Sequence, residues 1–364
     1  TGVVMAQPLP PAPRVAGLVE AMGPKPLCGG CGAKLGAAGL ASALATLPAP
    51  TRPDVLSGRG DDAAILRAAT GVQVITTDHL RALTGDPRLM ARIAANHALG
   101  DIFAMGGQAQ TATAVCTVPS GLEAKVEDTL FQMMTGAVEV LNEAGCALVG
   151  GHTGEGKELA LGFAVNGLVD ENLRGVMVKG GMKAGDVLLL TKPIGTGTLF
   201  AAHALLKTRG RWIDAALDSM VQSNRLGAVC LQKHGATACT DLTGFGLLGH
   251  LVEMTRPSNV DAEIDLNALP LLDGAQETSA AGILSSLQPA NVRLRRALRN
   301  QEAAVAHPNY PLIFDPQTAG GLLASMPAAK ADACVAALKA LGYTHTAVIG
   351  RVLAQGDDLA PIVL

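Results

Sequence analysis

Aromatic residues are scarce in this chain, which has one Trp, two Tyr and six Phe among 364 residues. Core filling therefore falls to Ala, Val, Leu and Ile. The net charge is −3, and no basic stripe is interleaved with aromatics, so the sequence lacks the features of a nucleic-acid-binding protein. Hydrophobic residues make up 49% and charged residues only 16%, which excludes a disordered chain and predicts a globular protein with room for two domains.

Long apolar runs are also missing. No segment approaches the roughly 20 residues needed to span a bilayer, and glycines interrupt each candidate, including DVLLLTKPIG (186–195). These absences predict a soluble, cytoplasmic protein without a membrane span.

A dense cysteine pattern is absent as well, which excludes a disulfide scaffold. Most cysteines stand in apolar contexts such as ATAVCTV and AVCLQK, where cysteine behaves as a small hydrophobic residue. The histidines show neither H-x-x-x-H nor C-x-x-H spacing, so we interpret them as polar contacts and not as metal ligands. The seven cysteines are at positions 28, 31, 116, 146, 230, 239 and 334.

Glycine and proline divide the chain. A proline-rich stretch, PLPPAPRV (8–15), predicts a flexible linker over 1–25, and the first residue is Thr1, which suggests a chain trimmed from a longer one. A glycine- and lysine-rich connection at 171–186 separates two predicted domains, 26–172 and 173–364. Strands and helices alternate without a regular βαβα order, which favours an α+β fold over a doubly wound sheet.

Hydrophobic patterns predict the main elements of the first domain. VQVITTD (72–78) and TATAVCTVP (111–119) are typical of strands. Residues 87–107 predict a helix that begins at a proline and ends at Gly106–Gly107, and residues 122–145 predict a long amphipathic helix. In the second domain, strand patterns at DVLLL and NVDAEIDLN precede a last helix and a final strand pair.

Two familiar phosphate-binding loops fail on inspection. GHTGEGKE (151–158) fits G-x-x-x-x-G-K, but Glu158 replaces the Ser or Thr that should hold Mg²⁺, and a strand pattern follows where a helix is required. GTGTLF (195–200) lacks the third glycine of a dinucleotide-binding loop.

With both phosphate-binding loops rejected, the feature that stands out is a recurring aspartate at the end of an apolar element, usually next to glycine or threonine. Each one alone is explained by an Asx turn or a helix cap. Several converging carboxylates would repel one another and need a divalent cation, and Mg²⁺ in turn bridges carboxylates to the phosphates of a nucleotide. These aspartates are Asp61, Asp62, Asp78, Asp101, Asp241 and Asp315.

The segment CGGCGAKLG (28–36) leaves three interpretations open from its spacing alone. It could be half of a zinc site, a redox pair, or a nucleophile on a flexible phosphate-binding segment. The zinc interpretation needs a second ligand pair, and the chain has no other C-x-x-C. Lys34, three residues after Cys31, would favour the Cys31 thiolate.

The motifs together resemble the selenide, water dikinases (selenophosphate synthetases), within the superfamily of aminoimidazole-ribonucleotide-synthetase-like ATP enzymes. The resemblance covers residues 26–364 and implies two α+β domains, with dimerisation through the sheet of the first domain. The matching segments, in the family's order, are GCGAK, GDDAA, TTD, RIAANHALGDIFAMGG, ALVGGHT, TDLTGFGLLGHL and DPQTAGGLL.

This resemblance implies an activity and a set of residues. The family converts ATP, selenide and water into selenophosphate, AMP and phosphate. Cys31 matches its active-site cysteine and Lys34 its essential lysine, which also contacts the nucleotide, and the glycines around them match a mobile lid. Asp62, Asp101 and Asp241 match metal-binding positions. The positions that match nucleotide contacts are Arg59, Gly60, Asp61, Asp78, Asp101, Gly150, Gly151, His152 and Thr153.

The resemblance also implies cofactors and partners: Mg²⁺, K⁺ as a further cation, a homodimer, and a cysteine-desulfurase-like protein that donates selenide. The chain departs from the family pattern at Ala33, where a second cysteine is common, and at Cys28, which creates CGGC. Asn96 and His97 replace the usual Thr-Asn. These departures resemble the subgroup in which the synthetase follows an NADH-dehydrogenase-like flavin domain.

Two other functions compete with this one. The first is an ATP-dependent kinase or synthetase of the same superfamily acting on another small molecule, which would not need a thiol and a lysine on the lid. The second is a non-catalytic nucleotide- or selenium-binding module, which would not need every matched aspartate together with Lys34.

Overall fold

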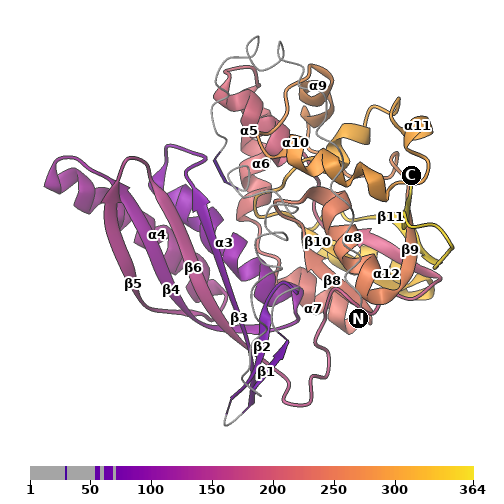
Figure 1. Cartoon of the computed structure of the whole chain (residues 1–364). Helices are drawn as coiled ribbons and strands as arrows, with labels where there is room; N and C mark the ends of the chain where they lie inside the picture. The colour runs from indigo at the N-terminus through magenta and orange to yellow at the C-terminus, as the bar shows by residue number, and fades with distance from the viewer. Residues whose placement is uncertain (1–28, 31–53, 58–60, 69–70) are drawn as a thin grey trace.

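The computed structural model describes residues 29–30, 54–57, 61–68 and 71–364, and its two domains lie side by side (Figure 1). The first domain contains a six-stranded sheet of order β1-β2-β3-β6-β4-β5. β4 and β5 pair in parallel, and the other neighbours pair antiparallel. Its elements are β1 (Val55–Ser57), β2 (Ala64–Ala68), β3 (Gly71–Arg81), α3 (Pro87–Ala104), β4 (Gln108–Pro119), α4 (Glu123–Glu143), β5 (Ala147–Gly156) and β6 (Ala160–Val169).

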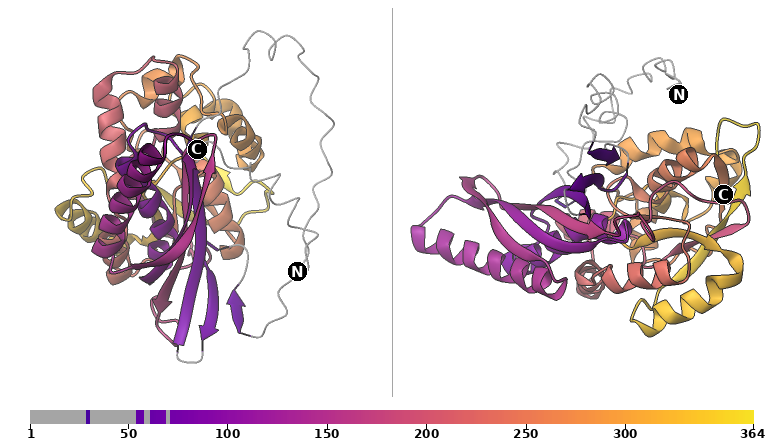
Figure 2. Two further views of the ribbon diagram at one scale, coloured as in Figure 1. Left: turned by 90° about the vertical axis from the view of Figure 1, so that its left-hand side faces the viewer. Right: turned by 90° about the horizontal axis from the view of Figure 1, so that it is seen from below.

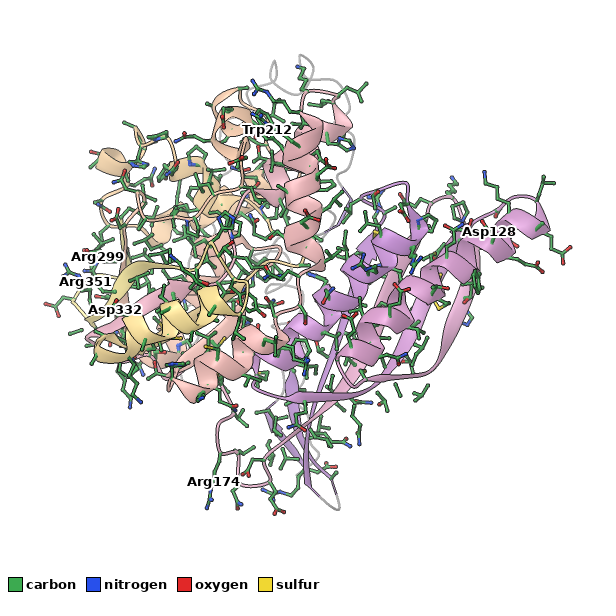
Figure 3. The ribbon with its side chains drawn as sticks, turned by 180° about the vertical axis from the view of Figure 1, so that it is seen from behind. Asp128, Arg174, Trp212, Arg299, Asp332 and Arg351 are labelled. Atoms are coloured by element: carbon green, nitrogen blue, oxygen red, sulfur yellow. The ribbon has the colours of Figure 1, made fainter. Side chains whose placement is uncertain are left out.

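One face of this sheet is covered by α3 and α4, as the view from behind shows (Figure 3). The strands alternate accordingly: in β4, Ala112, Ala114 and Cys116 are buried, whereas Val115 between them is exposed. Such alternation is typical of a sheet with one packed face. Among the described residues, no helix covers the other face of β4.

The second domain contains another six-stranded sheet, of order β12-β9-β11-β7-β10-β8. All its neighbours pair antiparallel except β12 and β9. Its strands are β7 (Asp186–Leu190), β8 (Ala238–Asp241), β9 (Val260–Ile264), β10 (Leu322–Pro327), β11 (Ala347–Ala354) and β12 (Ile362–Val363). Its helices are α5 (Thr196–Ala204), α6 (Gly210–Val221), α7 (Arg225–Lys233), α8 (Gly246–Ser258), α9 (Ala275–Ala280), α10 (Gln288–Asn291), η2 (Val292–Ala297), α11 (Gln301–Ala304), η3 (Tyr310–Phe314) and α12 (Ala328–Ala340).

Both faces of the second sheet are buried. Leu188 and Leu190 of β7 pack into one apolar core with α8, while Leu189 between them belongs to the core that contains α7 and α12. This period of two explains why the strand reads as a continuous apolar run in the sequence.

Helix α3 joins the two domains because it packs on β3 and β6 of the first sheet and also contacts α6, α7 and β8 of the second domain (Figure 2). It begins at Pro87 after Asp86, whose carboxylate accepts a hydrogen bond from the Leu89 N–H at 3.0 Å. All residues from Ala94 to Ala104 are buried. This burial places Asp101 between the domains.

The predicted α+β class is confirmed by this arrangement. The helix predicted over 87–107 ends at Ala104, because Gly106 turns the chain with a φ of +71°. GHTGEGKE lies largely within β5 and is not a loop before a helix, in agreement with the rejection of a P-loop. No helix in the described ranges is long and apolar enough to cross a membrane.

Candidate active site

Three aspartates from distant parts of the sequence meet where the domains adjoin. Asp62 precedes β2, Asp101 lies on α3 and Asp241 ends β8. One carboxylate oxygen from each lies within 4.8 Å of the others. The contact of α3 with β8 brings Asp101 to Asp241, so the site depends on the packing of one domain against the other.

Hydroxyl groups orient two of these carboxylates. Thr76, on β3, donates to Asp101 Oδ2 at 2.5 Å. Thr240, the residue before Asp241, donates to Asp62 Oδ1 at 2.8 Å. These bonds fix the rotation of both carboxylates and leave Asp62 Oδ2 buried, with no hydrogen-bond partner among the described residues.

Lys179 supplies a buried positive charge to the cluster. Its Nζ lies 3.0 Å from Asp62 Oδ1 and 2.9 Å from Glu253 Oε2 on α8, and its backbone N–H donates to Asp61 Oδ1 at 2.9 Å. Burial alone would lower the pKa of Lys179, but the two carboxylates outweigh it and raise that pKa. Lys179 therefore stays charged and holds the Asp61–Asp62 pair against the segment between the domains.

The cluster carries more negative charge than Lys179 offsets. Burial, together with the nearby Asp241 carboxylate, raises the pKa of Asp62 to about 7 despite Lys179. Burial and then the charges of Asp241, Asp78 and Asp62 raise the pKa of Asp101 well above its ordinary value. Three carboxylates at this spacing repel one another without a cation.

The residues present fit a magnesium ion. All three donors are hard carboxylate oxygens, the partnerless Asp62 Oδ2 offers a lone pair, and no thiol or imidazole belongs to the set. Gly100 of α3 leaves the space that the cluster needs, because a Cβ there would lie 2.6 Å from Asp241 Oδ2.

Asp78, on β3, belongs to a second polar group across the same junction. His97 Nδ1 accepts a hydrogen bond from the Ala319 N–H at 3.1 Å, which leaves the proton on Nε2, 3.3 Å from Asp78 Oδ2. Ala319 adopts a φ of +47° and belongs to the DPQTAGGLL segment. His97, one of the departures from the family pattern, is thus a buried link between Asp78 and the second domain.

The start of the glycine segment lies at this junction. The Gly30 N–H donates to the Arg81 carbonyl at 3.0 Å, and a Cβ on Gly30 would come within 2.5 Å of Thr318 Oγ1. Gly30 has a φ of +56°, so both its conformation and its surroundings require glycine. Of the remaining predicted site residues, Cys28, Cys31, Lys34, Arg59 and Gly60 lie outside the described residues.

Gly150, Gly151, His152 and Thr153 are not brought to the carboxylate cluster within one chain. They lie on β5, the edge strand, and Gly151 pairs with Ala114, which faces Phe163, which faces Asp78. Three strand spacings separate Gly151 from Asp78, a distance of about 14 Å.

Sequence reasoning missed several of these contacts. Lys179 stands in an unremarkable glycine-rich connection, and its closeness to Asp62 depends on a fold that no local pattern encodes. Lys192 was also missed: it is fully buried and donates to the carbonyls of Ser219, Gln222 and Ala319. His250 was correctly interpreted as a polar contact, since its Nε2 accepts from the Thr243 N–H at 3.1 Å.

Comparison with known proteins agrees with this fold. Residues 60–169 match the N-terminal domain of AIR synthase related proteins, and residues 183–360 match their C-terminal domain. The fold and these two matches define a two-domain protein of the AIR synthase related class. A solved structure, AaThiL complexed with AMPPCP and TMP, superimposes with a TM-score of 0.63 at 20% identity, over 90% of this chain and 93% of that one.

Curated relatives identify the family within this class. The selenide, water dikinase of Pelobacter propionicus is 36% identical over 331 residues, which cover 90% of this chain and 93% of the relative. That of Geobacter metallireducens is 37% identical over 330 residues, with coverage of 88% and 93%. The chain belongs to the selenide, water dikinase family, and the resemblance inferred from its motifs is confirmed.

Proposed function

We propose that this protein is a phosphotransferase that makes selenophosphate from ATP, selenide and water, and releases AMP and phosphate. The observation that carries the proposal is the convergence of Asp62, Asp101 and Asp241 in a chain of this family. The competing assignment to a kinase for another small molecule has less support, because the likeness to AaThiL, at 20% identity, extends to the fold alone.

The three carboxylates would hold Mg²⁺, which when bound would neutralise phosphate charge. Thr76 and Thr240 orient the carboxylates before ATP arrives, so less reorganisation is needed on binding. Lys179 keeps Asp62 in place. Asp61, Asp78 and the residues Arg59 and Gly60 are proposed to contact the nucleotide, with K⁺ as a further cation.

Cys31 and Lys34 are proposed to act from the glycine segment. Lys34 would offset the negative charge that shifts during phosphoryl transfer, and the Cys31 thiolate would act on the selenium substrate. The contacts of Gly30 with Arg81 and Thr318 support this proposal, because they bring the residue before Cys31 to the domain junction. A segment that closes there would keep water from the phosphoryl group that selenide attacks.

We also propose that the working form is a homodimer in the cytoplasm, supplied with selenide by a cysteine-desulfurase-like protein. In the described part of the chain, one face of β4 is uncovered and the outer edge of β5 has no pairing strand, and both features support the dimer. The distance of Gly150–Thr153 from the carboxylates supports it too, since a second copy could supply those residues.

Product analysis tests the function. The protein is incubated anaerobically with ATP, Mg²⁺ and selenide, and the phosphorus products are identified by ³¹P NMR. We expect selenophosphate, AMP and phosphate in equal amounts, and none of them with Asp241→Asn. Accumulation of ADP, or turnover indifferent to selenide, would assign the chain to an ordinary kinase instead.

A further inference from the structure

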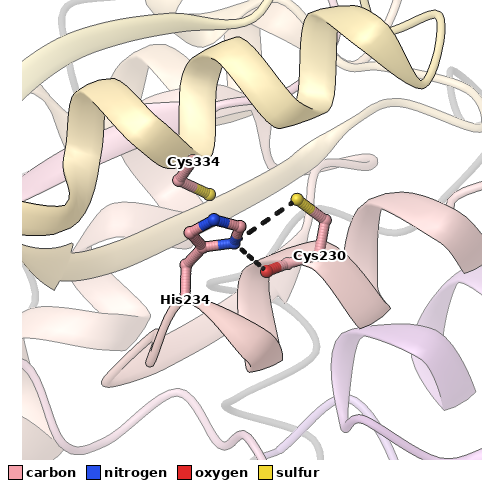
Figure 4. A group of neighbouring side chains, drawn as sticks. All are labelled: Cys230, His234 and Cys334. Atoms are coloured by element: carbon pink, nitrogen blue, oxygen red, sulfur yellow. Dashed lines mark hydrogen bonds between the residues drawn. The ribbon is translucent and has the colours of Figure 1, made fainter.

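Two cysteines and a histidine meet in the second domain, away from the carboxylate site. Cys230 lies on α7, His234 directly follows that helix, and Cys334 lies on α12 (Figure 4). One possible ligand atom from each lies within 4.8 Å of the others. Both cysteines are buried, and the imidazole lies beside their two sulfur atoms (Figure 4).

Backbone contacts prepare the imidazole as a ligand. His234 is four residues after Cys230, and its Nδ1 lies 2.8 Å from the Cys230 carbonyl oxygen, to which it can donate its proton. A histidine that donates one ring N–H to a backbone carbonyl keeps the lone pair of the other nitrogen free for a metal. The same helical turn therefore positions the Cys230 thiol and selects the His234 tautomer.

We propose that Cys230, His234 and Cys334 form a binding site for a zinc-class cation, separate from the magnesium site. Binding would form two metal–sulfur bonds and one bond to His234 Nε2, release both thiol protons to water, and leave a fourth position for a water molecule. Two thiolates and one imidazole are a known zinc donor set.

The chemistry of the donors separates this site from the carboxylate cluster. Thiolate and imidazole select zinc and similar transition metals, whereas carboxylates suit magnesium. Tetrahedral zinc, with bonds of about 2.3 Å to sulfur and about 2.0 Å to nitrogen, places its donors about 3.5–3.8 Å apart. Both sulfur atoms and one imidazole nitrogen already lie within 4.8 Å of one another, with Nδ1 3.6 Å from Cys230 Sγ. The side chains therefore need to move by about 1 Å, together with a rotation of the ring that turns Nε2 toward the sulfur atoms, to reach that arrangement.

The site would tie together two helices that cover one face of the second sheet. α7 also contacts α3 of the first domain, and Gln232 of α7 donates to the Gly175 carbonyl at 2.7 Å. An ion here would therefore brace the surface on which the two domains meet.

Co²⁺ titration of the full chain tests the proposal, because thiolate ligands give cobalt a charge-transfer absorption. Cys28 and Cys31 are first replaced by serine, so that their thiols cannot contribute. In this background we expect one equivalent of Co²⁺ with thiolate absorption, displaced by Zn²⁺ but not by excess Mg²⁺.

Matched variants locate the ion. Cys334→Ala and His234→Gln should each weaken Co²⁺ binding at least about tenfold, while Cys146→Ala, which removes another buried cysteine, should leave it unchanged. Circular dichroism checks that each variant is folded. His234 is only half-buried, so His234→Gln should stay folded and can test the proposal even if Cys334→Ala unfolds. No thiolate–cobalt absorption, equal binding in His234→Gln, or a Cys230–Cys334 disulfide that forms in place of metal binding would overturn the proposal.

Discussion

At the scale of single residues, Asp315 shows how burial disfavours the charged form of a carboxylate. Its Oδ2 accepts from the Gly197 N–H at the start of α5 at 3.0 Å and from Gln317 Nε2 at 2.9 Å, while its buried Oδ1 has no partner among the described residues. Burial raises its pKa from the ordinary 3.8 to about 7, and the bonds from Gln317, Gly197 and Thr198 offset this only in part.

This shift predicts a pH-dependent stability. Because the folded pKa lies above the unfolded one, the folded state binds the proton more tightly and loses stability as pH rises from about 4 to 7. Asp315→Asn removes that loss, so its free energy of unfolding relative to the parent should rise by about 2.5 kcal/mol between pH 5 and pH 8. Urea denaturation at both pH values measures it.

The neutral side chain of Asp315→Asn also changes hydrogen bonding, but that offset should be the same at both pH values and cancels. Asp332→Asn, on the exposed face of α12 (Figure 3), is the control and should show no pH-dependent difference from the parent. A parent-to-variant difference for Asp315→Asn that is constant with pH would contradict the prediction.

The glycine segment gives a second prediction for single residues. We expect Lys34→Ala to lose all selenide-dependent turnover, because the nearest basic residues, Lys25 and Arg52, lie outside the segment. Cys31→Ser should lose nearly all of it, since a serine hydroxyl is a poor nucleophile for selenium chemistry. Cys28→Ser should keep much of it under reducing conditions, and rates of selenophosphate formation measure all three.

The role left to Cys28 is protection of Cys31 through a reversible disulfide. The parent should then be inactivated by mild oxidants and recovered by thiols, with recovery impaired in Cys28→Ser. If Cys28→Ser is as inactive as Cys31→Ser under full reduction, the two cysteines act together as a dithiol or metal site.

At the scale of elements, α3 packs against both domains and also supplies Asp101 to the carboxylate cluster. Gly100 lies inside this helix, four residues before its end at Ala104, and alanine inside a helix is ordinarily more stable than glycine by about 1 kcal/mol. Here a Cβ would lie 2.6 Å from Asp241 Oδ2 and must displace that carboxylate. The carboxylate site, and not the helix conformation, is therefore what requires glycine at this position.

We expect Gly100→Ala to keep the parent's melting temperature, or raise it, and to lose at least about tenfold in kcat/KM for ATP, because a small displacement in a site can cost that much. Thermal denaturation and steady-state kinetics at several Mg²⁺ concentrations measure both effects. Gly210→Ala, at the first residue of α6 with open space around its Cβ position, is the matched control and should keep full activity. Full activity in Gly100→Ala would show that the cluster tolerates the displacement.

At the scale of the whole molecule, the first sheet leaves apolar side chains exposed. Val115 on β4 is 48% exposed and Val149 on the edge strand β5 is 61% exposed. Exposed apolar residues grouped on one sheet are typical of an interaction surface, as expected for the proposed dimer. This surface adjoins Gly150–Thr153, which lie too far from the carboxylates to act with them in one chain.

If the proposed dimer forms through this surface, Val115→Asp should convert it into monomers and reduce ATP turnover together with dimer content. Sedimentation velocity measures the oligomeric state, and activity at a series of protein concentrations tests whether the two fall together. Val305→Asp, at an exposed valine of the second domain, should leave both unchanged. A fully active monomer of Val115→Asp would remove the need for a second copy.

The sequence alone determined the main secondary-structure elements, the family and several of the site residues. The apolar pattern in 111–119 and the proline at the start of α3 are local signals. They predicted the right elements because strands and helices are set largely by neighbours in the chain. Motif order gave the family. The same motifs singled out Asp62, Asp101 and Asp241 as metal-binding positions. That their carboxylates lie close together was an expectation until the structure showed it.

Only the tertiary structure decided which side chains meet. Lys179 reaches Asp62 across more than a hundred residues, His97 bonds to Ala319 in the other domain, and Cys334 joins Cys230 and His234. The C-x-x-x-H spacing of Cys230 and His234 was visible in the sequence, but it forms a ligand pair only with the thiol that α12 supplies. Such contacts depend on how helices pack on a shared sheet, and packing is a property of the whole chain that no short segment encodes.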